Sequence, residues 1–205
     1  MKIRTLGIVS GLLTLLVGCS NIWEKLEPDR YRGGVTVRRV EGSFRNPIKF
    51  KVAENIPVLT IQGNRRINES WDSYLRFSFN KGSVEASPLD VRAQGHIESG
   101  ELGLSYFPFR KDEVENKFDI SLDFGGEIGY ADFDMIGKVG PIYSNVHDSV
   151  LFWGGKVGAT AEYKLNNKIS LFASGWYNLT DNNADKCSAN LDGGGCFFGL
   201  EIKLP

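Results

Sequence analysis

The chain has 205 residues, with 24 basic and 25 acidic side chains that leave a net charge of −1. This balance offers no basic excess for binding a phosphate backbone, so nucleic acid is not an expected partner. The length allows one domain. The 24 glycines and 12% aromatic residues suit many turns and close contacts between strands.

Residues 1–18 have the pattern of an export signal. Lys2 and Arg4 precede an uncharged apolar run at 6–17, which is too short and too close to the N-terminus to favour a spanning helix. The run ends in Leu16-Val17-Gly18-Cys19, which resembles the bacterial lipobox. The resemblance implies removal of 1–18 and acylation of Cys19, and an uncharged residue after the cysteine implies sorting to the outer membrane. An ordinary signal peptide with a chance cysteine is the alternative.

Residues 19–34 are predicted to be a polar linker between the acylated cysteine and a domain over 35–205. No apolar stretch after the signal approaches 18 residues. Helices and closed barrels are the two structures that pair every backbone group in lipid. Without a helix-length apolar stretch, any structure that spans a membrane must therefore be built from strands.

Alternation of apolar and polar residues predicts eight strands. The pattern is clear at 117–133, where Phe118, Ile120 and Leu122 share one face and Asp119 and Ser121 the other. Residues 48–53 also alternate and could extend either of the first two strands. The predicted strands are 35–43, 56–64, 71–80, 97–107, 117–133, 150–165, 168–179 and 196–204.

Two long alternating segments, 150–165 and 168–179, meet at Asn166-Asn167, a pair that suits a tight hairpin turn. In the first segment the odd positions are apolar or small, whereas the even ones include charges and glycines. A strand of about 15 residues is roughly three times the usual soluble length. This length indicates a tilted wall strand, apolar toward lipid and polar toward a lumen.

The connections between the predicted strands alternate in length. If the chain enters from the side of its lipid, the inner turns are 65–70, 108–116 and 166–167, and the outer loops are 81–96, 134–149 and 180–195. Short inner turns and longer outer loops are typical of transmembrane barrels.

Aromatic residues on the apolar face mark both strand ends. Trp71, Tyr106 and Tyr163 fall at the inner ends, and Tyr130, Trp153 and Tyr177 at the outer ends. Ten residues separate Trp153 from Tyr163, roughly 25 Å along the membrane normal for a tilted strand. These six residues are predicted to form two interfacial girdles.

The stretch 158–173, Gly-Ala-Thr-Ala-Glu-Tyr-Lys-Leu-Asn-Asn-Lys-Ile-Ser-Leu-Phe-Ala, resembles the penultimate hairpin of small OmpA/OmpX-type outer-membrane barrels. The pattern of such barrels extends over 35–205. The resemblance implies an all-β fold, an eight-stranded antiparallel up-and-down transmembrane β-barrel. The chain departs from the family by ending in Leu204-Pro205 rather than in an aromatic residue, and by carrying a lipobox.

Charged residues of the polar face are predicted to line the lumen. Eight strands leave an interior just wide enough for side chains, so these charges must pair. A salt-bridged plug is the favoured interpretation, and a narrow ion path or pH-sensitive gate is the alternative. The acids of 117–133 are expected to pair with Lys156 and Lys164, and the lumen is too tight for Asp119 and Asp123 to act as a glycosidase pair. The residues are Arg76, Glu101, Asp119, Asp123, Glu127, Lys156, Glu162, Lys164, Glu201 and Lys203.

Cys187 and Cys196 flank an Asn-, Asp- and Gly-rich segment in an exported chain, and we expect them to form a disulfide. A metal site is not expected, because no His or further Cys lies nearby.

His96 and His147 fall at the outer rim. His147-Asp148-Ser149 resembles in miniature the His-x-Ser of outer-membrane lipid A deacylases, and parity places His147 and Ser149 on the lipid-facing side. A Ser–His pair also needs an orienting acid, and Asp148 points the other way.

Together these features predict a non-enzymatic outer-membrane β-barrel lipoprotein with a structural or surface-interaction role through its outer loops. No cofactor is expected, and outer-membrane lipid and lipopolysaccharide are the expected partners. A lipid-anchored lipocalin-like carrier of a hydrophobic ligand and a lipid A hydrolase are the alternatives.

Overall fold

The computed structural model describes residues 28–44, 51–86, 91–110, 117–139, 142–182, 187–190 and 193–204. Each regular element in these ranges is a β-strand. No helix within them is long and apolar enough to cross a membrane. The strands are β1 (Arg30–Phe44), β2 (Lys51–Arg66), β3 (Trp71–Ala86), β4 (Val91–Tyr106), β5 (Phe118–Val139), β6 (Ile142–Lys164), β7 (Ile169–Asn182), β8 (Cys187–Asn190) and β9 (Gly193–Lys203).

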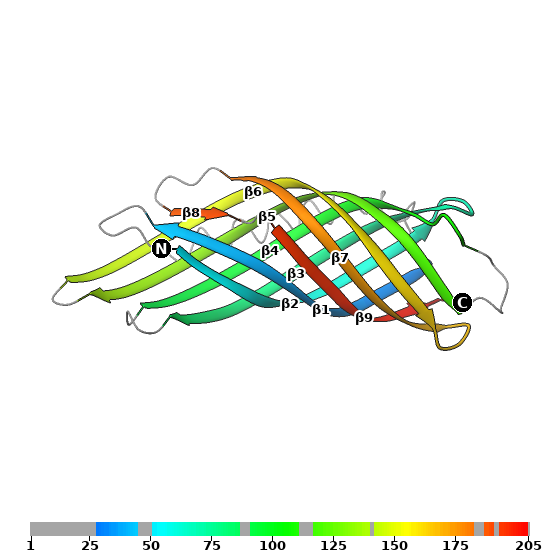
Figure 1. Cartoon of the computed structure of the whole chain (residues 1–205), viewed down its shortest axis with the longest axis horizontal. Helices are drawn as coiled ribbons and strands as arrows, with labels where there is room; N and C mark the ends of the chain where they lie inside the picture. Colours follow the sequence, from blue (N-terminus) through cyan, green and yellow to red (C-terminus); the bar gives the residue numbers. More distant parts are fainter. Residues whose placement is uncertain are drawn as a thin grey trace.

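Eight of these strands form a closed wall. Consecutive strands from β1 to β7 pair antiparallel, β7 pairs with β9, and β9 pairs with β1. Figure 1 shows the strands winding round a common axis, with the C-terminus at one end of the barrel. The predicted eight-stranded antiparallel up-and-down barrel is confirmed.

The register fixes the tilt of the wall. A path that starts at Arg30 on β1 and passes from each residue to its partner on the next strand reaches β9 at Gly193. Arg30 itself pairs with Lys203 on β9. The stagger is therefore ten residues (203 − 193). For eight strands this corresponds to a tilt of about 43°.

The wall has an apolar outside and a polar inside. Outward residues such as Leu102 and Leu179 are 60% and 67% exposed, whereas inward residues such as Arg32, Glu101 and Glu162 are buried. A water-soluble barrel would place these two classes the other way round. The arrangement matches a wall that faces hydrocarbon over a band bounded by aromatic residues.

Several strands continue well past their predicted ends, so the sequence-based outer loops were wrong in extent. β3 runs to Ala86 and β4 starts at Val91, which makes most of the predicted loop 81–96 strand. β5 and β6 likewise cover most of 134–149. Beyond the bilayer both faces of a hairpin meet water, so pairing continues although the alternation that marks a membrane strand fades.

The start of the wall and the last predicted outer loop also differ from expectation. β1 begins at Arg30, five residues before the predicted barrel domain and inside the predicted linker. Residues 51–53 belong to β2. Within the predicted loop 180–195 the four residues of β8 pair with residues 41–44 of β1, as an extra strand above the wall.

The pairing between β2 and β3 ends at Leu59–Phe79, and that between β6 and β7 ends at Phe152–Asn182. Beyond these pairs, β3, β4, β5 and β6 remain joined to one another as a four-stranded sheet. We call residues 80–86, 91–97, 131–139 and 142–151 the projecting sheet. Figure 1 shows its two hairpins extending from the end of the barrel opposite the C-terminus, which we call the outer end.

Candidate functional site

The inner end of the lumen is closed by a cluster of arginines and carboxylates. Asp72 on β3 contacts Arg30 of β1, and it receives two further bonds from Arg110, at 2.7 and 2.5 Å. Arg110 comes from the turn after β4 and stacks on Phe107, with its guanidinium carbon 3.5 Å from the ring centroid. Phe107 is itself buried. The first residues after β4, 107–110, therefore fold inward and place Phe107 and Arg110 at the inner mouth.

Arg32 is the most deeply enclosed basic residue of this inner cluster, at 2% exposure. Its Nη2 lies 3.1 Å from Glu162 Oε2, and its Nε lies 2.5 Å from Glu201 Oε2. Its guanidinium also packs over the Phe172 ring at 5.1 Å. One arginine thus joins carboxylates from β6 and β9 across the lumen.

A second cluster lies in the middle of the lumen around Glu101. Its two oxygens accept hydrogen bonds from Tyr74 at 2.6 Å, Lys156 at 2.7 Å and Arg76 at 3.1 Å. Lys156 therefore pairs across to β4, rather than with an acid of β5 as the sequence suggested. The guanidinium of Arg76 and the ammonium of Lys156 both pack over the Trp176 ring.

Two further pairs extend the network. Lys164 Nζ lies 2.7 Å from Asp119 Oδ2 at the inner end. Toward the outer end, Glu127 accepts from Arg38 at 2.8 Å and from Asn178 at 3.1 Å. Lys203, the last residue of the predicted lumen set, has inward parity but is exposed at the mouth.

Asp123 is a buried carboxylate held by hydroxyl groups. Ser105, Ser121 and Thr160 donate to it at 2.6, 3.0 and 2.5 Å. Among the described residues it has no basic ion-pair partner. Three donors from three strands satisfy the carboxylate oxygens without a cation, which sequence parity alone did not indicate.

Beyond the Arg38–Glu127 pair, the buried inward side chains that the structure describes are apolar. Val58, Ile97, Ala131, Val150 and Phe152 are all buried on the inward face. Ile97, Ala131 and Val150 are consecutive partners on β4, β5 and β6, at the start of the projecting sheet. Above the ion pairs, the described inward side chains at the start of the projecting sheet are therefore hydrocarbon.

Several lumen residues were missed from the sequence. Arg30 and Arg32 lay in the predicted linker, and Arg110 lay in a predicted turn. An Arg-x-Arg spacing ahead of Val35 was the available signal, because it continues the alternation of β1 toward the N-terminus. A turn residue that folds back into the lumen leaves no periodic signal.

The six predicted girdle residues are on the outward face of the wall. Trp71 and Tyr106 are partners across β3 and β4, and their ring centroids lie 4.9 Å apart. Tyr163 pairs with Phe118 at the same inner end. Toward the outer end, Trp153 and Tyr177 are exposed and Tyr130 is half-buried.

The predicted disulfide is wrong. Cys196 is a free and exposed thiol on the outward face of β9. It pairs with Val37 of β1, whereas Cys187 pairs with Phe44, seven residues farther along the same strand. Seven residues span about 23 Å, far beyond the Cα separation that a disulfide bridges. Cys19, the expected lipidation site, lies outside the described residues.

Among the rim residues whose side chains are described, Ser149 and His96 do not form a catalytic pair. Ser149 is exposed and opposes Asp132, which in turn opposes His96. The histidine and serine are therefore two strands apart, about 10 Å, and His96 Nε2 instead contacts Glu98 at 2.7 Å. The side chains of His147 and Asp148 lie outside the described residues. No group of three metal-ligating side chains that could hold a metal occurs in the described ranges.

The chain matches no protein-family model and no curated protein. It does match solved structures. The outer membrane protein OprG of Pseudomonas aeruginosa aligns with a TM-score of 0.59 and 16% identity, covering 85% of this chain and 94% of OprG. The fold is that of a small outer-membrane barrel.

Two other solved barrels resemble the chain more weakly. Neisserial surface protein A aligns with a TM-score of 0.45 and 13% identity, covering 86% of this chain and 97% of that protein. Ail, the attachment invasion locus protein of Yersinia pestis, aligns with a TM-score of 0.44 and 13% identity, covering 86% and 99%. At such scores and identities the likeness concerns the general architecture, and function has to be argued from this chain's own residues.

Proposed function

We propose that this protein is a non-enzymatic outer-membrane β-barrel lipoprotein that binds extended polypeptide segments at the cell surface through its projecting sheet. The observation that carries the proposal is the outer edge of β6. Within the described residues, 142–151 pair with β5 on one side and with no strand on the other. Such an edge is a template for strand addition.

The direction of the backbone groups at this edge follows from the register. Lys164 N donates to Lys117 O on the β5 side, and Leu165 N donates to Ile169 O on the β7 side. Because β5 and β6 pair without interruption, even residues of β6 bond toward β5 and odd residues point away from it. Tyr143, Asn145, His147 and Leu151 therefore point their backbone N–H and C=O groups away from β5, toward the open edge.

The residue types at the two edges of the projecting sheet differ. Residues 142–151 of β6 contain one acid, one histidine and no lysine or proline. Residues 80–86 of β3, the opposite edge, contain Lys81, Gly82 and Glu85. Charged residues and short length discourage pairing at an edge. The β6 edge is longer and carries one acid and no lysine, which supports it as the binding edge.

The packed lumen supports an interaction role over transport. Ion pairs fill the inner and middle levels, and hydrocarbon side chains fill the outer level. A channel requires a continuous aqueous path, and a lipocalin-like carrier requires an apolar cavity. Planar-bilayer recordings of the folded protein should accordingly show no stable conductance.

Hydrogen exchange on the barrel in lipid nanodiscs tests the open edge. The amides of Asn145 and His147 should exchange rapidly, whereas those of Val146 and Asp148 should be protected by their bonds to β5. A decapeptide of alternating threonine and valine, with a lysine at each end, serves as the strand probe. Binding should slow exchange at the odd positions, and slow exchange there without the peptide would contradict an open edge.

Asn145→Pro provides the matched variant. Proline removes one edge donor and keeps the β5 ladder, since the N–H of residue 145 points away from β5. The variant should fold but should no longer bind the strand-probe peptide. Unchanged peptide binding would rule out strand addition at β6.

The lipobox supports anchoring at Cys19, and the apolar wall supports insertion without it. Cys19→Ala should therefore still require detergent for extraction and should still migrate differently before and after heating. Mass spectrometry of the wild-type N-terminus should show an acylated Cys19. Release of Cys19→Ala by a buffer wash would contradict membrane insertion of the wall.

A further inference from the structure

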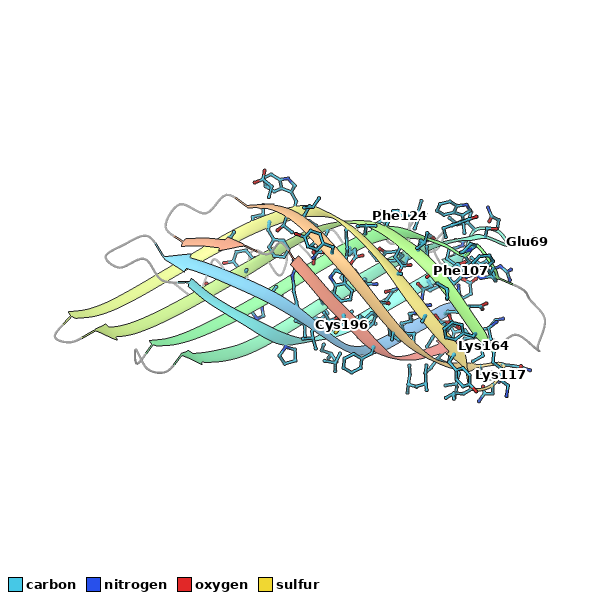
Figure 2. All side chains as sticks on the ribbon, in the orientation of Figure 1. Glu69, Phe107, Lys117, Phe124, Lys164 and Cys196 are labelled. Atoms are coloured by element: carbon cyan, nitrogen blue, oxygen red, sulfur yellow. The ribbon has the colours of Figure 1, made fainter. Side chains whose placement is uncertain are left out.

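The open edge of β6 belongs to a strand whose direction relative to the membrane is fixed. Figure 2 shows Lys164, the last residue of β6, with Lys117 and Phe107 at the end of the barrel away from the projecting sheet. Residues 142–151 therefore begin away from the bilayer and run toward it. This direction is the same in every copy that shares a membrane, and it limits which strands can pair with the edge.

The open edge of β6 faces partly away from the bilayer. The path through successive partners from β1 to β9 moves ten residues toward the outer end, so each step from one strand to the next rises along the barrel axis. The step beyond β6 leads to the position of β7, which ends at Asn182. Along residues 142–151 the edge is therefore directed outward as well as sideways.

The open edge of β3, at the other side of the projecting sheet, is less accessible. Ile67 N donates to Trp71 O, so odd residues of β2 bond toward β3. Pro57 is the next odd residue beyond Leu59, the last paired residue, and it has no N–H to donate, which ends the ladder. β2 nevertheless continues past Pro57, joined to β1, and its backbone occupies the position beside β3.

Two copies in one membrane cannot join their β6 edges. A rotation about the membrane normal relates such copies, so both β6 strands run toward the same bilayer. When their open edges face each other, strands that each tilt by about 43° cross at about 86°. Neighbouring strands in a sheet are rotated by only about 20–25°.

Two copies on facing membranes can join these edges. A two-fold axis perpendicular to the projecting sheet reverses the direction of β6 and turns the second barrel toward the first. The two outward-directed edges then lie side by side as antiparallel strands with matched tilts. Such a pairing is isologous, since each copy contributes the same residues.

We propose that the β6 edges of two copies on apposed outer membranes pair antiparallel and hold the membranes together. The inference rests on the proposed function, because it uses the same edge, and it names the bound segment as residues 142–150 of a second copy. It makes the projecting sheet a self-recognising adhesion surface.

The register of this pairing follows from the direction of the backbone groups. Odd residues of β6 point their N–H and C=O groups toward the edge, so odd residues must face odd residues and the two-fold axis passes through a residue position. An axis at Val146 aligns 142–150 of both copies and sets Asn145 opposite His147 of the second copy. An axis at Asp148 sets two acids opposite each other, and one at His147 sets two imidazoles opposite each other. An axis at Asn145 or earlier shortens the overlap, so the axis at Val146 gives the longest overlap without such a pair.

A single cysteine at position 146 tests this register. Val146→Cys is placed in a background of Cys19→Ala, Cys187→Ser and Cys196→Ser, reconstituted in liposomes and treated with a mild oxidant. The two Cα atoms at position 146 would lie about 4.5 Å apart, within the range that a disulfide bridges. Ser144→Cys is the matched control, because its two Cα atoms would lie about 14 Å apart. Val146→Cys should give disulfide-linked dimers and Ser144→Cys should not, and equal dimer yields would overturn the register.

Diluting the liposomes distinguishes pairing between membranes from pairing within one. At a constant protein-to-lipid ratio, pairing within one membrane is independent of the liposome concentration, whereas pairing between liposomes follows mass action. About tenfold dilution should therefore lower the dimer fraction of Val146→Cys by up to about tenfold and disperse the clusters seen by light scattering. A dimer fraction that dilution leaves unchanged would overturn pairing between membranes.

Asn145→Pro removes an N–H that the pairing uses. Combined with Val146→Cys, it should abolish both the clusters and the dimers, and an excess of the strand-probe peptide should do the same to Val146→Cys alone. Arg92→Gln on β4, away from the edge, is the control and should keep both. Clusters that persist in Asn145→Pro would rule out the β6 edge as their cause.

Insertion of each variant is checked by the change in gel migration on heating. Inserted protein that binds the strand-probe peptide but neither clusters nor cross-links overturns the self-pairing alone. Inserted protein that does not bind the peptide overturns the open edge, and with it the proposed function.

Discussion

The wall and the projecting sheet are made from the same strands, yet different physical constraints act on them. In the wall every strand has two neighbours, outward residues are mostly apolar, and buried inward charges are held by ion pairs or hydroxyl groups. In the projecting sheet β3 and β6 each have one neighbour within the described residues, and strict alternation is lost. The comparison indicates that the bilayer imposes alternation and closure, whereas backbone pairing alone sets the length of the strands.

The largest effect should come from breaking the ion pairs inside the wall. Arg32→Met leaves Glu162 and Glu201 buried without their common partner, which should cost about 3–5 kcal/mol. The measurement is urea unfolding of the detergent-folded barrel, followed by loss of the heat-modifiable band. Arg92→Met in the projecting sheet is the control and should change stability by less than about 0.5 kcal/mol. Equal effects would remove the distinction between the two regions.

The seam where β1 meets β9 should be the next most sensitive place. An added Cβ at Gly199 would lie 2.1 Å from Gly33 O and 2.7 Å from Gly34 Cα. Gly199→Ala should therefore destabilise the closed wall by about 1–3 kcal/mol in the same urea assay. Gly155→Ala is the matched control on the outward face of β6, where nothing lies within 4 Å of the added carbon. A neutral Gly199→Ala would mean that the seam is looser than its register indicates.

A loss of similar size should follow from changing the hydroxyl-bound carboxylate. Asp123→Asn places amide hydrogens where Ser105, Ser121 and Thr160 now donate, and the mismatch should cost about 1–3 kcal/mol. Urea midpoints of the folded barrel measure it, with the exposed Asp181→Asn as control. A wild-type midpoint for Asp123→Asn would indicate that the three hydroxyl groups readily reorient.

The sequence predicted the wall better than it predicted the projecting sheet. The fold was predictable because residues such as Ile120, Leu122 and Leu171 alternate with polar ones wherever the wall is expected to face lipid. The lengths of β5 and β6 were not, since residues 134–149 lie beyond the lipid and carry no strict alternation. The register of β8 and β9 on β1, which separates Cys187 from Cys196, depends on pairing between distant parts of the chain.

The sequence predicted that charged residues pair inside the lumen, but it did not predict which residue pairs with which. Parity placed Glu101, Glu162 and Lys156 on the polar face, but parity does not say which strand lies across the lumen. Arg30, Arg32 and Arg110 became lumen residues only through the early start of β1 and the inward fold of a turn. The early start of β1 has a short periodic signal in the Arg-x-Arg spacing, whereas the inward fold of the turn has none.

The smallest effect on stability should come from shortening the projecting sheet. Met135 and Val146 are partners, so joining them through Asn-Gly removes the tip of the β5–β6 hairpin and preserves the register. The shortened protein should show the wild-type heat-modifiable shift and a urea midpoint within about 0.5 kcal/mol. It should also no longer bind the strand-probe peptide. Failure of this variant to fold would show that the projection is part of the barrel's stable unit.

The account depends most on which face of the wall meets hydrocarbon. Nitroxide labels at single cysteines replacing the outward Ile120, Val157 and Leu171, in a background lacking the native cysteines, test this directly in liposomes. Collisions with lipid-soluble oxygen should exceed those with a water-soluble nickel chelate at all three sites. Labels shielded from both reagents, as in a closed apolar core, would contradict the assignment of these residues to a lipid-facing wall.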